Sequence, residues 1–330
     1  MDSIMKSAWS KIVVCLCACA GIALMAGVAR ADTYPSRPLR IVVPFSPGGG
    51  VDLVARVIGQ QLSLQMGQSV IIENKPGASA NIGADYVAKA DPDGYTILCA
   101  ANGLATNVTL FPHTPFNALR DFAPVAKVGS APLMVIVAED FPAKTLKDLI
   151  AMARKEPGKL AYGSAGNGSS QHLGGEMFKL AAKIDVLHVP YKGGAPAMNE
   201  LLAGRISYMV QNPLEALPHV KAKQLRALAV AGSKRMALFP DVPTAAEAGL
   251  PGYEAPVWWG FVAPAKTPKE VVAKLNVEIV KALASPKVRD RLTQLGVVID
   301  SGTPEQFGQF LNAEVAKWAK VINTAGIHAD

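Results

Sequence analysis

Residues 44–52 read Pro-Phe-Ser-Pro-Gly-Gly-Gly-Val-Asp, and residues 162–172 read Tyr-Gly-Ser-Ala-Gly-Asn-Gly-Ser-Ser-Gln-His. Each glycine-rich turn follows a short apolar run and precedes an amphipathic stretch, a pattern that predicts a strand, a turn and a helix. The first N–H groups of a helix have no partner inside it and lie at its positive end, so each turn can hold an anion. Two such turns in different halves of the chain predict two surfaces that grip one ligand.

Short apolar runs alternate with helical patterns along the rest of the chain, which indicates an α/β fold. A strand, a glycine turn and a helix recur near residues 45 and 165, so we expect two α/β lobes. The first would comprise residues 32–130 and 257–330, and the second residues 131–256. The chain would cross between them at residues 127–137 and 253–264. Strands are predicted at residues 39–45, 69–73, 95–100, 133–137, 160–164, 186–189, 206–210 and 225–231, and helices at residues 51–64, 77–90, 145–155, 169–182, 195–202 and 267–284, with two more starting near residues 285 and 303.

Residues 1–31 have the composition of an export signal. Two lysines precede an apolar run at residues 12–28, and Ala29-Arg30-Ala31 forms a small-x-small cleavage site. We therefore expect cleavage after Ala31 and a mature protein located in the periplasm. A retained membrane anchor and lipidation at Cys19 are the alternatives.

The charge and the chemistry-bearing side chains exclude several classes of protein. The net charge is +7, but the lysines and arginines are scattered, which argues against a nucleic-acid partner and suits a small anionic ligand. The five histidines show no metal-ligand spacing, so neither a metal site nor a cofactor is predicted. Cys99 would be the one cysteine of the mature chain, which leaves no intramolecular disulfide, and its apolar surroundings favour a core position.

The second glycine turn does not match the common nucleotide-binding or hydrolase motifs. It lacks the Lys-Ser/Thr ending of a P-loop and the third glycine of a dinucleotide fingerprint, and no serine lies within Gly-x-Ser-x-Gly. An enzyme that acts on an anionic small molecule remains an alternative. Ser169 near His172 is the pair that would supply its nucleophile and base.

Several spaced motifs together make the chain after residue 31 resemble the Bug/TctC family, the extracytoplasmic solute-binding proteins of tripartite tricarboxylate transporters. The resemblance covers essentially the whole of that chain. It is carried by the turns at residues 44–52 and 162–172 and by Glu73-Asn74-Lys75-Pro76-Gly77-Ala78, Asn81-Ile82-Gly83, Asp91-Pro92-Asp93-Gly94-Tyr95-Thr96, Val189-Pro190-Tyr191-Lys192-Gly193, Leu225-Arg226-Ala227-Leu228-Ala229-Val230, Pro240-Asp241-Val242-Pro243-Thr244, Trp259-Gly260 and Ala263-Pro264.

The resemblance implies a two-lobed, type II periplasmic-binding-protein fold of the Venus-flytrap kind. It implies a non-enzymatic, monomeric receptor that captures a small organic carboxylate between its lobes and delivers it to membrane permease subunits. A ligand sensor for a signalling partner is a second possibility. The ligand-binding residues carried over by position are Phe45, Ser46, Pro47, Gly48, Gly49, Ala78, Ser79, Asn81, Ser164, Gly168, Ser169, His172, Tyr191, Lys192 and Gly193.

One position departs from the family pattern. Many relatives carry an aspartate after the strand at residues 206–210, where this chain has Gln211-Asn212. An aspartate there could pair with a ligand amine, and an amide does so less well. We include Gln211 in the predicted site and expect a ligand without a cationic group.

Overall fold

A ten-stranded mixed sheet forms the frame of residues 34–329, the part of the chain that this computed structural model describes. Its strands follow the order β2-β1-β3-β9-β4-β7-β5-β6, with β8 and β10 also paired to β4. The predicted export signal and its cleavage site lie outside the described residues. Within them, no helix is long and apolar enough to span a bilayer.

The helices and strands alternate along most of the chain, as the sequence pattern predicts. In chain order they are β1 (Leu39–Val43), α2 (Gly50–Met66), β2 (Val70–Asn74), the 3₁₀ turn η1 (Ala78–Ala80), α3 (Asn81–Ala88), β3 (Thr96–Ala101), α4 (Gly103–Leu110), β4 (Phe122–Ala138), α5 (Leu146–Lys155), β5 (Ala161–Ser164), α6 (Ser170–Ala182), β6 (Leu187–Pro190), α7 (Gly194–Leu202), β7 (Tyr208–Gln211), α8 (Pro213–Lys221), β8 (Leu225–Ala231), β9 (Pro256–Pro264), α9 (Lys269–Ala284), α10 (Pro286–Gln294), β10 (Val298–Ile299) and α11 (Pro304–Ala325).

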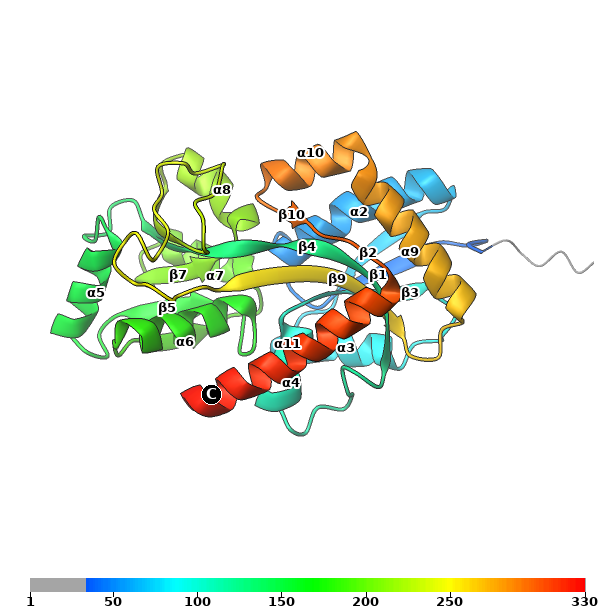
Figure 1. Ribbon diagram of the computed structural model, residues 1–330, viewed down its shortest axis with the longest axis horizontal. Coiled ribbons are helices and arrows are strands. Elements are labelled where there is room, and N and C mark those ends of the chain that lie inside the picture. The colour runs from blue at the N-terminus through cyan, green and yellow to red at the C-terminus, as the bar shows by residue number, and fades with distance from the viewer. Residues whose placement is uncertain (1–33, 330) are drawn as a thin grey trace, which may run out of the picture. The chain divides into compact units, whose positions relative to one another are not determined.

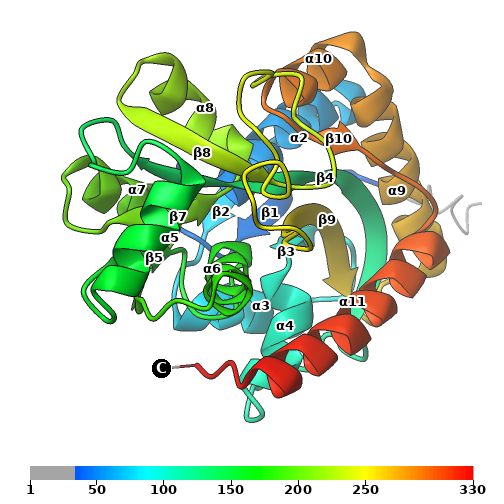
Figure 2. The ribbon, with the colours of Figure 1, turned by 60° about the vertical axis from the view of Figure 1, so that its left-hand side comes forward.

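Strand β4 lies in the middle of the sheet and pairs with strands from both of its halves. Its residues 122–132 pair antiparallel with β9, and its residues 133–138 pair antiparallel with β8. Figures 1 and 2 show β4 and β9 side by side between two groups of elements. We call β1, β2, β3 and β9, with the helices packed on these strands, the β1 side. We call β5, β6, β7 and β8, with the helices packed on these strands, the β7 side.

Each side contains parallel strands with helical connections between them. On the β1 side, β1 lies between β2 and β3 and is parallel to both. On the β7 side, β5 is parallel to β6 and to β7. Because parallel neighbours need crossover connections, the turns that leave β1 and β5 lead directly into helices. Those turns are the two glycine-rich segments.

Apolar packing joins the C-terminal helix to strands formed early in the described chain. A core cluster on the β1 side contains Leu98, Trp258, Phe307 and Trp318, so α11 packs beneath strands made much earlier in the sequence. Trp258 and Trp318 both donate their indole N–H to Glu314 Oε2, at 3.2 Å and 2.8 Å. The polar atoms of these buried rings are therefore satisfied.

Several helices begin where the sequence places a capping residue. Thr145 caps α5 in a capping box with Asp148, as their spacing predicts. Ser169 caps α6 by accepting a hydrogen bond from the N–H of His172. Cys99 is fully buried, which confirms the predicted core position.

Candidate functional site

The two glycine turns meet at one small cavity. The space that a water-sized sphere can occupy there is about 20 Å³, which is room for about one water molecule. Residues of both the β1 side and the β7 side line this cavity. They are Phe45, Gly49, Gly50, Val51, Ala101, Gly103, Ala165, Ser169, Ser170, Gln171, Gly194, Asn212, Glu215, Val257 and Trp259.

The N-termini of several helices converge on this cavity. Gly50 begins α2, Gly103 begins α4, Ser170 begins α6 and Gly194 begins α7, and all four line the cavity. Each helix N-terminus carries a partial charge of about +0.5. The described residues of the lining include no lysine or arginine, so the positive potential here comes from backbone N–H groups.

Direct hydrogen bonds connect the β1 side to the β7 side around the cavity. The hydroxyl of Ser46 donates to the carbonyl oxygen of Lys192 at 2.8 Å. The hydroxyl of Thr106 donates to the carbonyl oxygen of Gly168 at 2.7 Å. The β1 side and the β7 side are therefore in contact through segments that adjoin the cavity.

A buried carboxylate, Asp52, organises the first glycine turn. Its side chain is 2% exposed and accepts hydrogen bonds from the Gly48 N–H at 2.9 Å, from Arg56 and from Asn74. Burial alone would raise the pKa of Asp52, but the hydrogen bonds from Arg56, Gly48 and Asn74 together hold it below its ordinary value. Asp52 is therefore ionised, and its hydrogen bonds hold the first glycine turn in place.

A second buried carboxylate, Glu215, lies against the start of α2. Its Oε1 accepts from the Gly50 N–H at 2.7 Å and from Asn212 Nδ2 at 2.7 Å, and the residue is 7% exposed. Burial raises the pKa of Glu215, while the bonds from Asn212 and Gly50 oppose that rise. The sequence alone does not single out this residue, because its contact with Gly50 spans 165 positions. The one local signal is Asn212 three residues before it, an N-cap pattern.

A chain of amides connects Glu215 to the second turn. Gln171 Nε2 donates to Gln211 Oε1 at 3.0 Å, and Gln211 Nε2 donates to Glu215 Oε2 at 3.3 Å. The backbone and side-chain amides of Asn212 also donate to Gln211 Oε1, at 2.8 Å and 2.9 Å. With three donors on its oxygen, the Gln211 side chain is oriented so that its NH₂ group faces Glu215.

Neutral side chains organise the second glycine turn. The Gly166 N–H donates to Ser164 Oγ at 3.1 Å, and the Gly168 N–H donates to His172 Nδ1 at 3.1 Å. Ser164 Oγ also lies 2.7 Å from His188 Nε2, and the rings of His172 and His188 stack with centroids 4.4 Å apart. Ser169 Oγ accepts from the backbone N–H of His172 at 3.2 Å as the N-cap of α6.

The structure places the predicted site residues in three groups. Phe45, Gly49 and Ser169 line the cavity, and Gln211 is hydrogen-bonded to its lining. A second group surrounds the cavity without lining it. Ser46 and Lys192 form a hydrogen bond between the β1 side and the β7 side, and Gly193 is the N-cap of α7. Asn81 lines a neighbouring cavity, which Phe45 also lines. Ser164, Gly168 and His172 are buried within the second turn.

The third group lies farther out. Pro47 and Gly48 are exposed, as is Ala78, while Ser79 and Tyr191 are partly buried. Ser79 accepts from Asn107 through its carbonyl oxygen at 2.7 Å, and the N–H of Tyr191 donates to the carbonyl oxygen of Ser164. None of these five residues lines the cavity.

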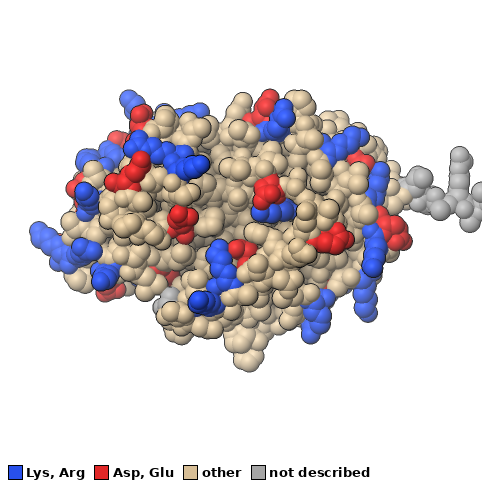
Figure 3. Space-filling view, viewed as in Figure 1, with Lys and Arg blue, Asp and Glu red and all other residues tan. Residues whose placement is uncertain are grey.

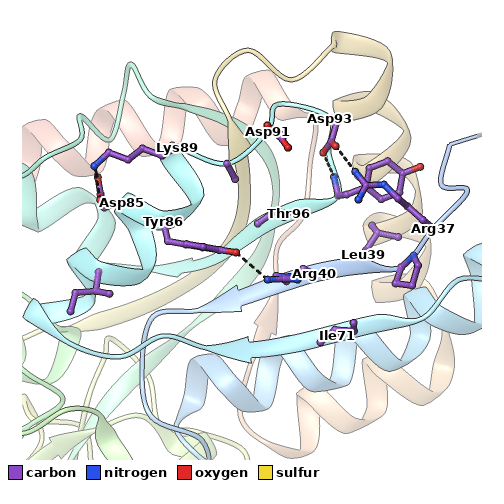
Figure 4. Close-up of a pocket in the computed structure, with 14 residues that line it drawn as sticks. Arg37, Leu39, Arg40, Ile71, Asp85, Tyr86, Lys89, Asp91, Asp93 and Thr96 are labelled. Atoms are coloured by element: carbon purple, nitrogen blue, oxygen red, sulfur yellow. Dashed lines mark hydrogen bonds and ion pairs between the residues drawn. The ribbon is translucent and has the colours of Figure 1, made fainter.

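A larger hollow of about 760 Å³ lies at the other end of β1, β2 and β3, beside α3 (Figure 4). Several of its charged side chains are paired with one another: Arg37 with Asp93 at 2.6 Å, and Lys89 with Asp85 at 2.7 Å. Arg40 bonds to Glu73 and to the hydroxyl of Tyr86. None of the described residues that line this hollow belongs to the site predicted from the sequence.

No metal-ligating cluster among the described residues marks another site, and the face shown in Figure 3 carries no large patch of one charge. Among residues 34–329, no three side chains of histidine, cysteine, aspartate or glutamate lie close enough together to hold a metal ion. Figure 3 shows lysines and arginines interspersed with acidic residues on the face it presents. The scattered basic residues predicted from the sequence give no continuous basic surface on that face.

Comparison with known proteins decides the family. The family model of the tripartite tricarboxylate transporter family receptor, TctC, matches residues 54–327. The chain belongs to the TctC family. This membership confirms the resemblance seen in the motifs, and it confirms a solute-binding protein of a transporter rather than an enzyme.

Solved structures of relatives superpose closely on this TctC-family chain. The periplasmic binding protein BugD is 36% identical with a TM-score of 0.86, covering 89% of this chain and 99% of its own. The MatC protein of Rhodopseudomonas palustris with bound malate is 35% identical with a TM-score of 0.84, covering 88% and 100%. The R. palustris protein Rpa4515 with adipate is 38% identical with a TM-score of 0.87, covering 89% and 99%. These likenesses confirm the predicted periplasmic-binding-protein fold.

Proposed function

We propose that this TctC-family receptor binds a small organic carboxylate between its two glycine turns, where the one-water cavity widens when the β1 side and the β7 side move apart. The observation that carries the proposal is the convergence of the N-termini of α2, α4, α6 and α7 on one cavity whose described lining holds no lysine or arginine. Backbone N–H groups would hold the carboxylate, each charge-assisted bond contributing about 1.5–3 kcal/mol. The malate and adipate bound to the two relatives support this class of ligand.

The predicted lobes supply a mechanism for capture. We propose that residues 32–130 with 257–330 and residues 131–256 move about the paired strands β4 and β9, which connect them. A ligand that contacts both glycine turns would favour the closed arrangement, because only that arrangement satisfies both sets of contacts. The closed receptor would then be recognised by membrane permease subunits.

The proposed location follows from the predicted signal and from the relatives. Cleavage after Ala31 would release the mature protein into the periplasm, and BugD is described as a periplasmic binding protein. A receptor that works there would act as a monomer that diffuses between ligand and permease.

Calorimetry on the exported, purified protein tests the proposal. The protein would be titrated with mono-, di- and tricarboxylates of two to six carbons, and its co-purifying small molecules would be identified by mass spectrometry. We expect stoichiometric binding of at least one carboxylate with no turnover. If none of them binds and no organic acid co-purifies, the proposed function is wrong.

A further inference from the structure

Among the described residues that line the cavity, Glu215 is the one ionisable side chain. It lies at the start of α8 and contacts the start of α2. It also contacts α7, because a Cβ on Gly194 would overlap Oε2 of Glu215. A ligand in this cavity therefore meets backbone N–H groups and one carboxylate.

Neutral amides hold this carboxylate. The donors to its two oxygens, the N–H of Gly50 and the side-chain amides of Asn212 and Gln211, carry no net charge. Oε1 receives two of these bonds at 2.7 Å, whereas Oε2 receives one at 3.3 Å. Since a carboxylate offers about four acceptor positions, Oε2 has capacity for a further donor.

The second turn offers the opposite chemistry. Ser169, Ser170 and Gln171 line the cavity at the start of α6, where the first N–H groups have no acceptor within the helix. A ligand carboxylate suits that end, and a hydrogen-bond donor suits Glu215. A second negative group placed against Glu215 would be repelled.

We infer that Glu215 makes this receptor select carboxylates that carry an ammonium or hydroxyl group beside the carboxylate. The inference rests on the proposed function and narrows its ligand class. It also reverses the expectation drawn from Gln211 at the end of β7, because the carboxylate that an aspartate would have supplied at that position comes instead from Glu215, four residues later in α8.

Three four-carbon acids that differ only at C2 test the inference: succinate with hydrogen, malate with hydroxyl and aspartate with ammonium. Each would be titrated by calorimetry into the wild-type protein and into Glu215→Gln, which keeps the shape of the side chain and removes its charge. Matched three-carbon and six-carbon sets extend the test to other ligand lengths. We expect the wild type to bind the ammonium or hydroxyl member at least tenfold more tightly than the unsubstituted acid, and Glu215→Gln to reduce that preference below threefold.

Two further variants keep the result interpretable. Glu156→Gln makes the same change of charge at an exposed position and should leave the preference intact. Glu215→Asp keeps the charge, but its shorter side chain places the carboxylate farther from the ligand. This variant should retain part of the preference, even if Glu215→Gln unfolds at a lower temperature.

The possible failures are distinguishable. If the wild type binds all members of a set equally, or if Glu215→Gln and Glu215→Asp both keep the full preference, this inference is overturned while the proposed function stands. If the wild type binds no carboxylate of any length, the proposed function fails and this inference fails with it.

Discussion

The two glycine turns share a local design but differ in the groups that receive their N–H bonds. In the first turn, the amides of Gly48 and Gly50 donate to carboxylates, those of Asp52 and Glu215. In the second turn, the amides of Gly166 and Gly168 donate to a hydroxyl and an imidazole nitrogen. Similar sequence patterns therefore produce a negatively charged environment at one turn and a neutral one at the other.

This difference bears on how a ligand would be oriented. Helix N-termini face the cavity from both turns, but near the first turn their positive potential is already partly balanced by Glu215. A ligand carboxylate would thus be stabilised more at the second turn. A glycine-rich turn before a helix indicates that an anion can bind there, and the structure shows that the anion can be one of the protein's own side chains.

The largest effect is expected from a methyl group in the second turn. Gly168 has φ +76° and a Cβ there would overlap Oδ1 of Asn107, whose amide holds the carbonyl of Ser79. We expect Gly168→Ala to lower the free energy of unfolding by about 2–5 kcal/mol, from backbone strain and overpacking. Urea unfolding monitored by circular dichroism measures it.

Two alanine variants are the controls for that measurement. Gly204 has φ +69°, and apart from its chain neighbours no described atom lies within 4 Å of the position that a new methyl group would take, so Gly204→Ala should cost only the backbone strain, about 1–2 kcal/mol. Gly49, in the first turn, has φ −78° and its nearest neighbour would be 3.7 Å from the new Cβ. Gly49→Ala should therefore be nearly neutral, and equal costs for all three would contradict the difference between the turns.

The charge on the first turn gives the next largest effect. Asp52→Asn removes the charge from hydrogen bonds with Gly48, Arg56 and Asn74, and should cost about 1.5–3 kcal/mol at pH 7. The pKa of Asp52 is lowered in the folded protein, so its stabilisation is complete above the unfolded value near 3.8 and is lost as the pH falls through the folded pKa.

Thermal unfolding at several pH values between 7 and 3 checks the sign. The gap in stability between wild type and Asp52→Asn should narrow as the solution becomes acidic. Asp241→Asn, at an exposed position, should show no such gap at any pH. A gap for Asp52→Asn that widens in acid would mean that the pKa of Asp52 in the folded protein lies above its unfolded value, the opposite of the expected direction.

The smallest effect separates capping from binding. Ser169→Ala removes the N-cap of α6 and Thr145→Ala removes that of α5, and each should cost about 1 kcal/mol in stability. Of these two residues only Ser169 lines the cavity, so only its variant should also weaken the binding of a carboxylate in calorimetry. If both variants bind with unchanged affinity, the second turn does not hold the ligand through Ser169.

The elements that could be predicted are those marked by local signals, such as capping residues and uninterrupted apolar runs. Helix α6 (Ser170–Ala182) begins within one residue of the predicted boundary because Ser169 is a strong capping residue. Strand β4 (Phe122–Ala138) is predicted only at residues 133–137, since Pro124, Gly129 and Pro132 interrupt the apolar pattern. The register of β4 against β9 shifts near Pro124 and again near Gly129, which accommodates those residues in the strand.

The site was predictable to the extent that it is local. The glycine turns and Ser169 could be recognised from neighbouring residues alone. Glu215 could not, because its surroundings combine the starts of α2, α7 and α8, which lie far apart in the sequence. Only the folded sheet brings these helix ends together.

The position of β9 between β3 and β4 has a consequence for how the chain is made. Strands β1 to β3 emerge early during synthesis, but their sheet lacks its central neighbour until residues 256–264 have followed. Their apolar face on the side of α3 and α4 is completed only when α11 (Pro304–Ala325) arrives. Such long-range pairing folds slowly and leaves hydrophobic surface exposed in the meantime. A nascent chain of this protein therefore depends on its C-terminal helix to cover its early strands.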